Sequence, residues 1–537
     1  MRTFLLAASA LVAVPAAAQQ PSRSPKLIVA ISVDQLSSDL FEAYRPHFTG
    51  GFKRLIDRGV VFANGYQSHA ATETCPGHST LLTGRHPAAN GIVANNWIDQ
   101  GAARSDKSIY CAEDERVAGS SSKDYSVSPE HLRASTLGDR LKAADPRSRN
   151  VAVAGKDRAA VMMGGRAVDQ RYYWDGKGWA SDRKDAAVPR IVTDFRSSFA
   201  ASLAAPRSAL VPPPLCQARA TPYQVSPTVT VGNGTLGRAA GDARALRASP
   251  EIDGATLALA AALTQQMGLG QGPATDVLSV GLSATDYVGH SYGWGGQEMC
   301  LQMLVLDGEL GRFLAWLDTR KVDYAVVLSA DHGGLDLVER LRANGNTAAE
   351  RADPGLAAGE VGKLLGPQVG RSGAVLLGEG VGGDVWLDRA IPAADRPRIL
   401  AAAVTRYRAH RQVEAVFTAA ELARLPVPSG DPSRWTIQQR VRASFDAGRS
   451  GDFIVVLKPY VSTVARPGPG YTASHGTPHD YDRRVPIVFM APGLAPAAPT
   501  GAADTVDILP TLASWVGLKL DQGSVDGTCR REAAACR

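Results

Sequence analysis

Short runs of apolar residues, each bounded by polar or turn residues, recur along the chain. They lie at 26–36 (KLIVAISVDQL), 151–155 (VAVAG), 276–282 (DVLSVGL), 324–330 (YAVVLSA) and 485–493 (VPIVFMAPG). A short, continuous apolar run is typical of a strand that is buried on both faces of a parallel sheet. We therefore expect these segments to be strands of one sheet.

Helical patterns occupy the stretches between these runs. The clearest examples are residues 135–144, 254–268 and 298–318. Strands that alternate with helices predict an α/β fold, in which a mostly parallel sheet is sandwiched by helices.

Two regions depart from this alternation. Residues 165–250 are rich in Arg, Pro, Gly and Trp, and residues 340–470 carry short mixed segments with many turn residues. We interpret both as capping insertions in one catalytic domain that spans residues 19–537, although the length of the chain also allows two to three domains.

Residues 1–18 read MRTFLLAASALVAVPAAA, with one arginine, a short apolar run and small residues at the end. This arrangement is typical of a signal peptide, and the apolar run is short for a membrane span. A retained anchor is the alternative. We expect a soluble protein that is periplasmic or secreted, with no membrane span once the signal peptide is removed.

Composition and charge change this picture little. Hydrophobic residues make up 45% of the 537 residues and charged residues 20%, which is an ordinary globular balance. The net charge of +6 comes without a dense Lys/Arg block. It therefore argues against a nucleic-acid scaffold and is compatible with attraction for anionic substrates.

Export would permit disulfides, and the chain has six cysteines. Cys529 and Cys536 flank a short loop, so they are the first pair that we expect. Cys216–Cys300 is a second hypothesis, because pairing cannot be read from a sequence. We expect Cys75 to be a packed free thiol.

Acidic and histidine residues follow three of the apolar runs. They are Asp34, Asp286, His290, Asp331 and His332. In open α/β sheets ligands bind at the carboxyl ends of the strands, so these side chains should converge at one edge. Asp oxygens with His nitrogens suit zinc better than magnesium or calcium. One such Asp could be a helix N-cap, but its recurrence at three strand ends favours a metal site.

A sixth candidate ligand lies in the segment TASHGTPHDYDRR. His475 and His479 are rivals for this role. Because Gly476 would allow the backbone to approach a metal closely, we predict that His475 is the ligand.

The segment TETCPGHSTLLTGR, residues 72–85, reads like a sulfatase motif with its key residues exchanged. Thr74 stands where a sulfatase has its cysteine, Cys75 is one residue out of register, and His78 replaces an arginine. A formylglycine sulfatase needs Cys or Ser at the position of Thr74, so this activity is excluded. A zinc-bound threonine hydroxyl could instead be a nucleophile. The simpler interpretation of Thr74 is a helix N-cap.

The segment TCPGHSTLLTG, followed by GIVANNW and by the three Asp/His sites in this order, resembles the alkaline phosphatase superfamily. It is most similar to the branch that combines type I phosphodiesterase/nucleotide pyrophosphatases with the two-zinc alkaline phosphatases that use a threonine nucleophile. The resemblance runs from about Lys26 to Leu518, and it implies an alkaline-phosphatase-like fold. No motif of the family covers the two insertions.

This resemblance also implies a ligand set and a mechanism. One Zn²⁺ would be bound by Asp34, Asp331, His332 and the Thr74 oxygen. A second Zn²⁺ would be bound by Asp286, His290 and His475. Asn95, which falls 21 residues after Thr74, would bind a phosphoryl oxygen, and the reaction would pass through a phosphothreonine intermediate.

Lys156 and Arg158 bear on the choice between a monoester and a diester. They follow an apolar run in the segment GKDR, which resembles the same stretch of the threonine-type alkaline phosphatases. We expect them in an extended stretch, where residues i and i+2 project to the same side and could clamp a phosphoryl group. A pair of solvated charges at a strand end is the simpler interpretation.

These observations predict a zinc-dependent alkaline phosphatase that acts on small phosphate monoesters. The enzymatic alternative is a phosphodiesterase or nucleotide pyrophosphatase. A zinc- or phosphate-binding scavenger on an inactive phosphatase fold is the non-enzymatic alternative.

Overall fold

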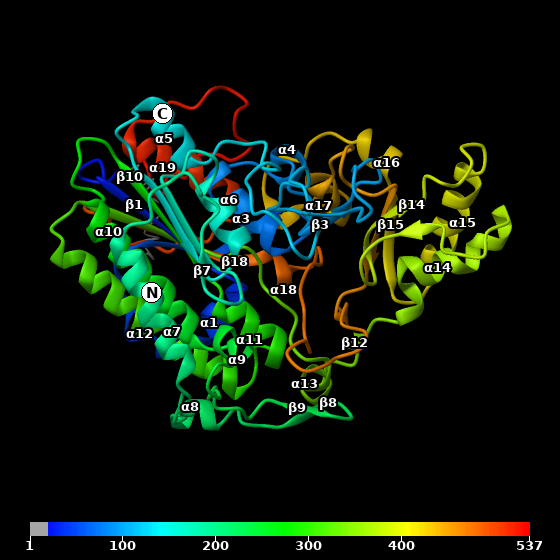
Figure 1. Ribbon diagram of the computed structural model, residues 1–537, viewed down its shortest axis with the longest axis horizontal. Coiled ribbons are helices and arrows are strands. Elements are labelled where there is room, and N and C mark those ends of the chain that lie inside the picture. Colours follow the sequence, from blue (N-terminus) through cyan, green and yellow to red (C-terminus); the bar gives the residue numbers. More distant parts are fainter. Residues whose placement is uncertain (1–19, 537) are drawn as a thin grey trace, which may run out of the picture.

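The structure is a computed structural model that describes residues 20–536 (Figure 1). The predicted signal peptide, residues 1–18, lies outside the described residues. Within the described part of the chain, no helix is both long enough and apolar enough to cross a membrane.

A nine-stranded sheet forms the centre of the described chain. Its strand order is β19-β2-β18-β11-β1-β10-β5-β6-β7. The strands are β19 (Ala503–Asp504), β2 (Val60–Tyr66), β18 (Arg484–Met490), β11 (Tyr324–Ser329), β1 (Leu27–Val33), β10 (Asp276–Leu282), β5 (Asn150–Ala154), β6 (Gln170–Trp174) and β7 (Trp179–Ala180). All of the predicted strands belong to this sheet.

Parallel pairing dominates the middle of the sheet. The neighbouring strands β11, β1, β10, β5 and β6 are all parallel. β18 runs antiparallel to both β11 and β2. The predicted mostly parallel sheet is therefore confirmed. The direction of β18 could not be read from its sequence, because a strand buried on both faces looks alike in either direction.

Helices cover both faces of the sheet (Figure 1). Successive residues of β1 point to opposite faces, so Leu27 and Val29 enter one apolar core while Ile28 enters another. The helices of these cores include α10 (Pro250–Met267), α12 (Gln297–Thr319), α5 (Leu137–Ala144) and α19 (Ile508–Val516). The three predicted helices are thus α5, α10 and α12.

The region 165–250 begins within this central architecture. Residues 170–180 form β6 and β7 and extend the central sheet, and α7 (Arg190–Ala204) packs against α10. The remainder includes a small ribbon of β8 (Tyr223–Ser226) and β9 (Val229–Val231).

Residues 340–470, which we call the accessory region, contain a second sheet of order β13-β14-β16-β15. It consists of β13 (Leu376–Leu377), β14 (Gly383–Leu387), β16 (Phe453–Leu457) and β15 (Val413–Thr418), all antiparallel. With α14 (Ala358–Leu365) and α15 (Arg396–Arg408) it encloses its own apolar core. In Figure 1 these elements extend to the right of the central sheet.

Disulfides join all six cysteines of the chain, which lie within the described residues. Cys216–Cys300 and Cys529–Cys536 pair as predicted. Cys75 pairs with Cys111, so the predicted free thiol is wrong. The two cysteines are 36 residues apart in sequence, and only the fold brings their segments together.

Candidate active site

The carboxyl ends of three neighbouring strands carry most of the predicted metal ligands. Asp34 follows β1, and Asp331 with His332 follows β11. Asp286 and His290 lie on α11 (Ala284–Tyr292), which follows β10. Because β11, β1 and β10 are adjacent in the sheet, these side chains meet at one edge.

Asp34, Asp331 and His332 form the first candidate metal group, group A. One potential ligand atom of each residue lies within 4.8 Å of the others. The His332 Nε2 atom is 3.6 Å from an Asp34 carboxylate oxygen and 3.2 Å from an Asp331 carboxylate oxygen. All three residues are buried.

Asp286, His290 and His475 form the second group, group B. The Nε2 atoms of His290 and His475 lie 3.3 and 3.4 Å from Asp286 Oδ1. His475 comes from a loop rather than a strand end, and Gly476 beside it has a φ of 106°, a conformation that favours glycine. The rival His479 lies away from the group, with its Nε2 2.9 Å from the Leu457 carbonyl oxygen.

The three histidines present the same ring nitrogen to the site. The Nδ1 atoms of His290, His332 and His475 lie 2.8, 2.9 and 2.8 Å from the backbone carbonyl oxygens of Ala473, Gly333 and Thr72. A carbonyl oxygen only accepts, so each Nδ1 carries the proton and each Nε2 offers a lone pair. Metal-binding histidines are commonly held in this way.

Group A contains buried polar atoms that have no hydrogen-bond partner within the described chain. They are Asp34 Oδ1, Asp331 Oδ2 and His332 Nε2. Buried polar atoms are nearly always satisfied, and one divalent cation would satisfy all three. The mixture of carboxylate oxygen and imidazole nitrogen fits zinc.

Lys156 lies between the two groups. Its ammonium nitrogen is 2.6 Å from Asp34 Oδ2 and 2.5 Å from Asp286 Oδ2, and the side chain is buried. Burial lowers the pKa of Lys156, but the charges of Asp286 and Asp34 raise it more, so the pKa lies above its usual value. Lys156 therefore fixes a positive charge at the centre of the site.

Gln35 connects the two groups. Its backbone N–H donates to Asp331 Oδ1 at 3.1 Å, and its side-chain Nε2 donates to Asp286 Oδ1 at 3.1 Å. Gln35 has a φ of 63°, which is unfavourable for a residue with a side chain. Gly289 leaves room for it, since a Cβ atom there would overlap with Gln35 Oε1. The sequence analysis missed Gln35, although it directly follows Asp34.

Thr74 is the first residue of α3 (Thr74–Thr83) and is buried. The same helix contacts group A through His78, whose Nδ1 atom lies 3.1 Å from Asp331 Oδ2. The N-cap position is held by Glu73, so Thr74 is not the cap that the simpler interpretation expected. An Arg158 Nη atom lies 3.4 Å from the Thr74 hydroxyl oxygen. Gly77 allows the close approach of α3, because a Cβ atom there would overlap with the Asp331 carbonyl oxygen.

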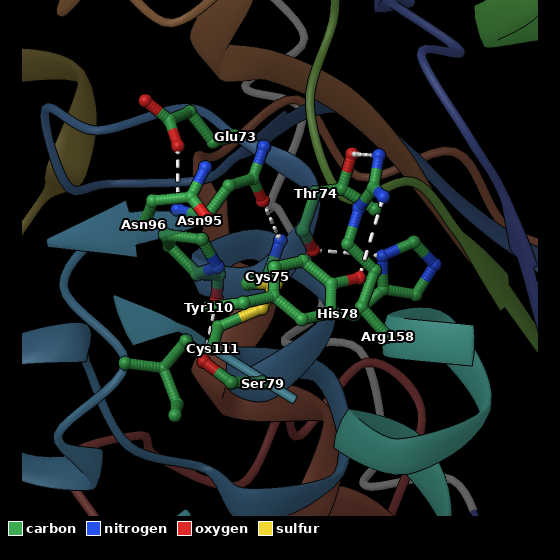
Figure 2. Close-up of a disulfide and its surroundings, with 12 residues drawn as sticks. Glu73, Thr74, Cys75, His78, Ser79, Asn95, Asn96, Tyr110, Cys111 and Arg158 are labelled. Carbon is green, nitrogen blue, oxygen red and sulfur yellow. Dashed lines mark hydrogen bonds between the residues drawn. A yellow bond between two sulfur atoms is a disulfide. The ribbon is translucent and has the colours of Figure 1, made fainter. Parts of the chain in front are cut away.

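The Cys75–Cys111 disulfide ties the start of α3 to the segment that carries Asn95 (Figure 2). The backbone N–H of Cys75 donates to Asn95 Oδ1 at 2.8 Å, and that of Cys111 donates to the Asn95 carbonyl at 2.9 Å. The Asn95 N–H donates to Glu73 Oε2 at 2.6 Å. Because its amide oxygen accepts from Cys75, Asn95 can offer its amide nitrogen to a ligand.

Lys156 and Arg158 are not in an extended stretch, contrary to the prediction. β5 ends at Ala154, Lys156 is the N-cap of α6 (Asp157–Gly164), and Arg158 lies in its first turn. Both side chains still reach the site, Lys156 between the metal groups and Arg158 beside Thr74. Tyr110, which the sequence analysis missed, donates to Asp157 Oδ1 at 2.8 Å and lies 3.5 Å from Arg158.

A cavity of about 510 Å³ adjoins these residues. Asn95, His290 and His475 lie on its wall, and residues 379–384, 386 and 454–457 of the accessory region also line it. The candidate site is therefore open toward the accessory region.

Comparisons with known proteins identify the family of the chain. The family model described as Type I phosphodiesterase / nucleotide pyrophosphatase matches residues 28–482. Alkaline phosphatase PhoK of Sphingomonas sp. is 49% identical over 508 residues, which cover 94% of this chain and 90% of PhoK. Alkaline phosphatase PhoD of Zymomonas mobilis is 43% identical over 518 residues, with 95% and 89% covered.

The fold is also similar to a solved structure. The crystal structure of wild-type alkaline phosphatase PafA has a TM-score of 0.82 with this chain at 25% identity, and the match covers 95% of this chain and 99% of that one. The predicted alkaline-phosphatase-like fold is thus confirmed. The chain belongs to the type I phosphodiesterase/nucleotide pyrophosphatase family, within the alkaline phosphatase superfamily.

Proposed function

We propose that this protein is an exported alkaline phosphatase, a zinc-dependent phosphate monoester hydrolase that forms a phosphothreonine intermediate. The observation that carries this proposal is the position of the Thr74 hydroxyl oxygen, which lies 3.4 Å from an Arg158 Nη atom and belongs to the helix whose His78 contacts Asp331 of group A. The names of the relatives PhoK and PhoD support the monoesterase activity.

Groups A and B would each hold one zinc ion. Asp34, Asp331, His332 and the Thr74 oxygen would bind the first, and Asp286, His290 and His475 would bind the second. Such cations would act as Lewis acids toward the attacking and leaving oxygens. The pairing of each histidine Nδ1 with a backbone carbonyl keeps the Nε2 lone pairs directed into the site.

Thr74 would act as the nucleophile. Its oxygen forms a bond to phosphorus while the ester P–O bond breaks, and the alcohol leaves with a proton in place of the one that Thr74 loses. Water then attacks the phosphothreonine, which restores the hydroxyl and releases inorganic phosphate. A covalent intermediate of this kind divides one difficult displacement into two easier ones.

Lys156, Arg158 and Asn95 would bind the phosphoryl oxygens. A monoester carries more negative charge than a diester, and two cationic side chains at the reacting group favour the more highly charged substrate. The fork of Arg158 can bind two oxygens at once, whereas Lys156 offers a point charge.

The experiment that tests this function compares a monoester and a diester of the same alcohol, with acid-quenched protein digested and analysed by mass spectrometry. We expect a higher kcat/KM on the monoester and phosphate on the peptide that contains Thr74. Thr74→Ala should lose nearly all activity, while Thr74→Ser keeps part of it because the hydroxyl remains.

Two other outcomes would replace the proposal. A higher kcat/KM on the diester would establish the phosphodiesterase alternative, for which the match to the type I phosphodiesterase/nucleotide pyrophosphatase family speaks. Binding of phosphate without turnover of either ester by the metal-loaded protein would establish the scavenger.

A further inference from the structure

The cavity beside the candidate active site is positioned to receive the leaving group of a substrate. It contacts Asn95, His290 and His475 on one side and the accessory region on the other. Its volume of about 510 Å³ is far larger than a phosphoryl group needs. The alcohol part of a phosphate ester held at Thr74 would therefore meet the cavity wall.

Three carboxylates line this wall, from Glu73, Glu379 and Asp384. Among the described residues that line the cavity there is no lysine or arginine. No ion pair within 4.0 Å involves any of the three carboxylates in the part of the chain that the structure describes. None of the three therefore has a cationic partner in direct contact among the described residues, although Glu73 feels the charges of His332 and Arg158 at longer range.

Neutral donors hold these carboxylates in place. Glu379 accepts from the Asn96 side-chain amide at 3.2 Å and from the Ser108 hydroxyl at 3.0 Å. Asp384 accepts from the Gly451 N–H at 2.6 Å. Such bonds orient a carboxylate without cancelling its charge, and they leave lone pairs free for a ligand.

Aromatic side chains also line the cavity. Trp97 and Trp386 are buried in it, and Tyr471 is 49% exposed with its ring centroid 5.2 Å from that of His290. Aromatic rings attract cations through their negative faces, and this attraction adds to that of a nearby carboxylate. A wall that combines aromatic rings with oriented carboxylates suits an alkylammonium group.

We propose that the cavity selects phosphate monoesters whose alcohol part carries an ammonium group, with Glu379 and Asp384 as specificity-determining residues. This inference rests on the proposed function, because it assigns the leaving-group side of the same site. Lys156 and Arg158 would bind the dianionic phosphoryl group, while the acidic wall binds the opposite charge at the other end of the substrate. Esters with a second anionic group would be disfavoured by repulsion from the same wall.

The test uses three substrates of similar size: O-phosphoethanolamine, propyl phosphate and phosphoglycolate, whose alcohol parts are cationic, uncharged and anionic. Rates are measured at about pH 8, where the amine is protonated and Asp384, whose pKa burial raises to about 7, is mostly ionised. The quantity compared is the ratio of kcat/KM for the cationic ester to that for the anionic ester. Dividing the wild-type ratio by the variant ratio cancels the intrinsic reactivity of each ester.

Glu379→Gln and Asp384→Asn remove one charge each and keep the shape and hydrogen-bonding oxygen of the side chain. We expect each to lower the ratio roughly fivefold to tenfold, and the double variant to lower it further. Added salt should weaken the wild-type preference, because it screens the wall. Glu360→Gln is the matched control, since it removes an exposed carboxylate of the accessory region that is paired with Lys363 and is not part of the cavity lining.

A binding measurement separates this inference from the proposed function. Calorimetry on Thr74→Ala gives the affinities for the same three esters without turnover. If the wild type hydrolyses none of them, the proposed function fails, and the binding ratios still decide the inference. If the ratios are equal in wild type and in the double variant, the inference is wrong although the phosphatase stands. Loss of a bound divalent cation in the double variant, with unchanged ester ratios, would likewise overturn it in favour of a cation site.

Discussion

The edge of the central sheet and the accessory wall of the cavity treat negative charge in opposite ways. At the sheet edge, Asp34 and Asp286 each lie within 2.6 Å of the Lys156 ammonium group. On the cavity wall, the hydrogen bonds that Glu379 and Asp384 accept within the described residues come from uncharged donors. The first region compensates its carboxylates, and the second leaves them uncompensated.

This difference shows which end of a substrate each region suits. A buried carboxylate that pairs with a cation or holds a metal supports chemistry on an anionic phosphoryl group. An uncompensated carboxylate in a cavity projects a negative potential onto whatever enters. The net charge of +6 does not predict which substrate charge either region favours, because the charged residues are distributed unevenly between the two regions.

The largest expected effect comes from removing the metal ions. Groups A and B at the sheet edge would bind these ions, whereas the accessory wall would not. Chelation should reduce monoester hydrolysis at least roughly a thousandfold, because Lewis-acid stabilisation of the reacting oxygens is lost. Added zinc should restore the activity, and elemental analysis should find two zinc ions per chain. Full activity in protein shown to be metal-free would contradict the assignment of groups A and B.

The second effect concerns the two cationic side chains at the sheet edge, Lys156 and Arg158. Lys156→Ala combined with Arg158→Ala should lower monoester kcat/KM by roughly two to four powers of ten, since each charge-assisted hydrogen bond contributes about 1.5–3 kcal/mol. Diester kcat/KM should fall much less, because a diester lacks the extra charge. Equal losses on matched mono- and diesters would mean that the pair serves folding or general binding instead.

A third effect concerns Gln35, which joins the two metal groups. Gln35→Met keeps the length of the side chain but removes the donor to Asp286, and it should weaken metal affinity by about 10- to 100-fold. Zinc titration of the purified protein measures this directly. Gln412→Met is a suitable control, because Gln412 is also buried but hydrogen-bonds with Arg351 and Asp353 in the accessory region. Unchanged zinc affinity in Gln35→Met would exclude a positioning role.

The sheet edge could be predicted from the sequence because its geometry follows a general rule. Asp34, Asp286 and Asp331 each stand just beyond an apolar run, and parallel strands direct their carboxyl ends to one edge. His475 does not follow an apolar run, so its choice over His479 as a candidate ligand depended on the neighbouring Gly476. The alternation of strands and helices likewise predicted the central sheet, because burial on both faces leaves a continuous apolar pattern.

The remaining features depend on contacts between distant segments. Cys75 and Cys111 pair because the fold places the segment of Asn95 beside α3, and no local pattern records this. Glu379 and Asp384 lie in the accessory region, whose short antiparallel strands give a weak periodicity. Gln35 is locally unfavourable in its left-handed conformation, so its position is imposed by contacts with Asp331 and Asp286 rather than by its own preference.

The smallest expected effect concerns the carboxylate of Asp384 on the cavity wall and is measured as a change in the stability of the protein. Burial raises the pKa of Asp384 from 3.8 to about 7, the Gly451 N–H lowers it in part, and the charge of Glu73 raises it. Between these two pH values the folded state holds more protons than the unfolded state, so the stability contributed by this group falls as pH rises and the loss is complete above about pH 7.

Asp384→Asn should therefore stabilise the protein at alkaline pH and have little effect in acid. Asparagine keeps an oxygen for the Gly451 N–H but cannot ionise. We expect the variant to exceed the wild type by about 1–3 kcal/mol near pH 8 and to match it near pH 4. Denaturant midpoints of both proteins at each pH give the difference, with Glu360→Gln as the control for loss of an exposed carboxylate. A stabilisation of equal size at both pH values would show that the gain comes from packing, and the wall would then not hold an uncompensated charge at Asp384.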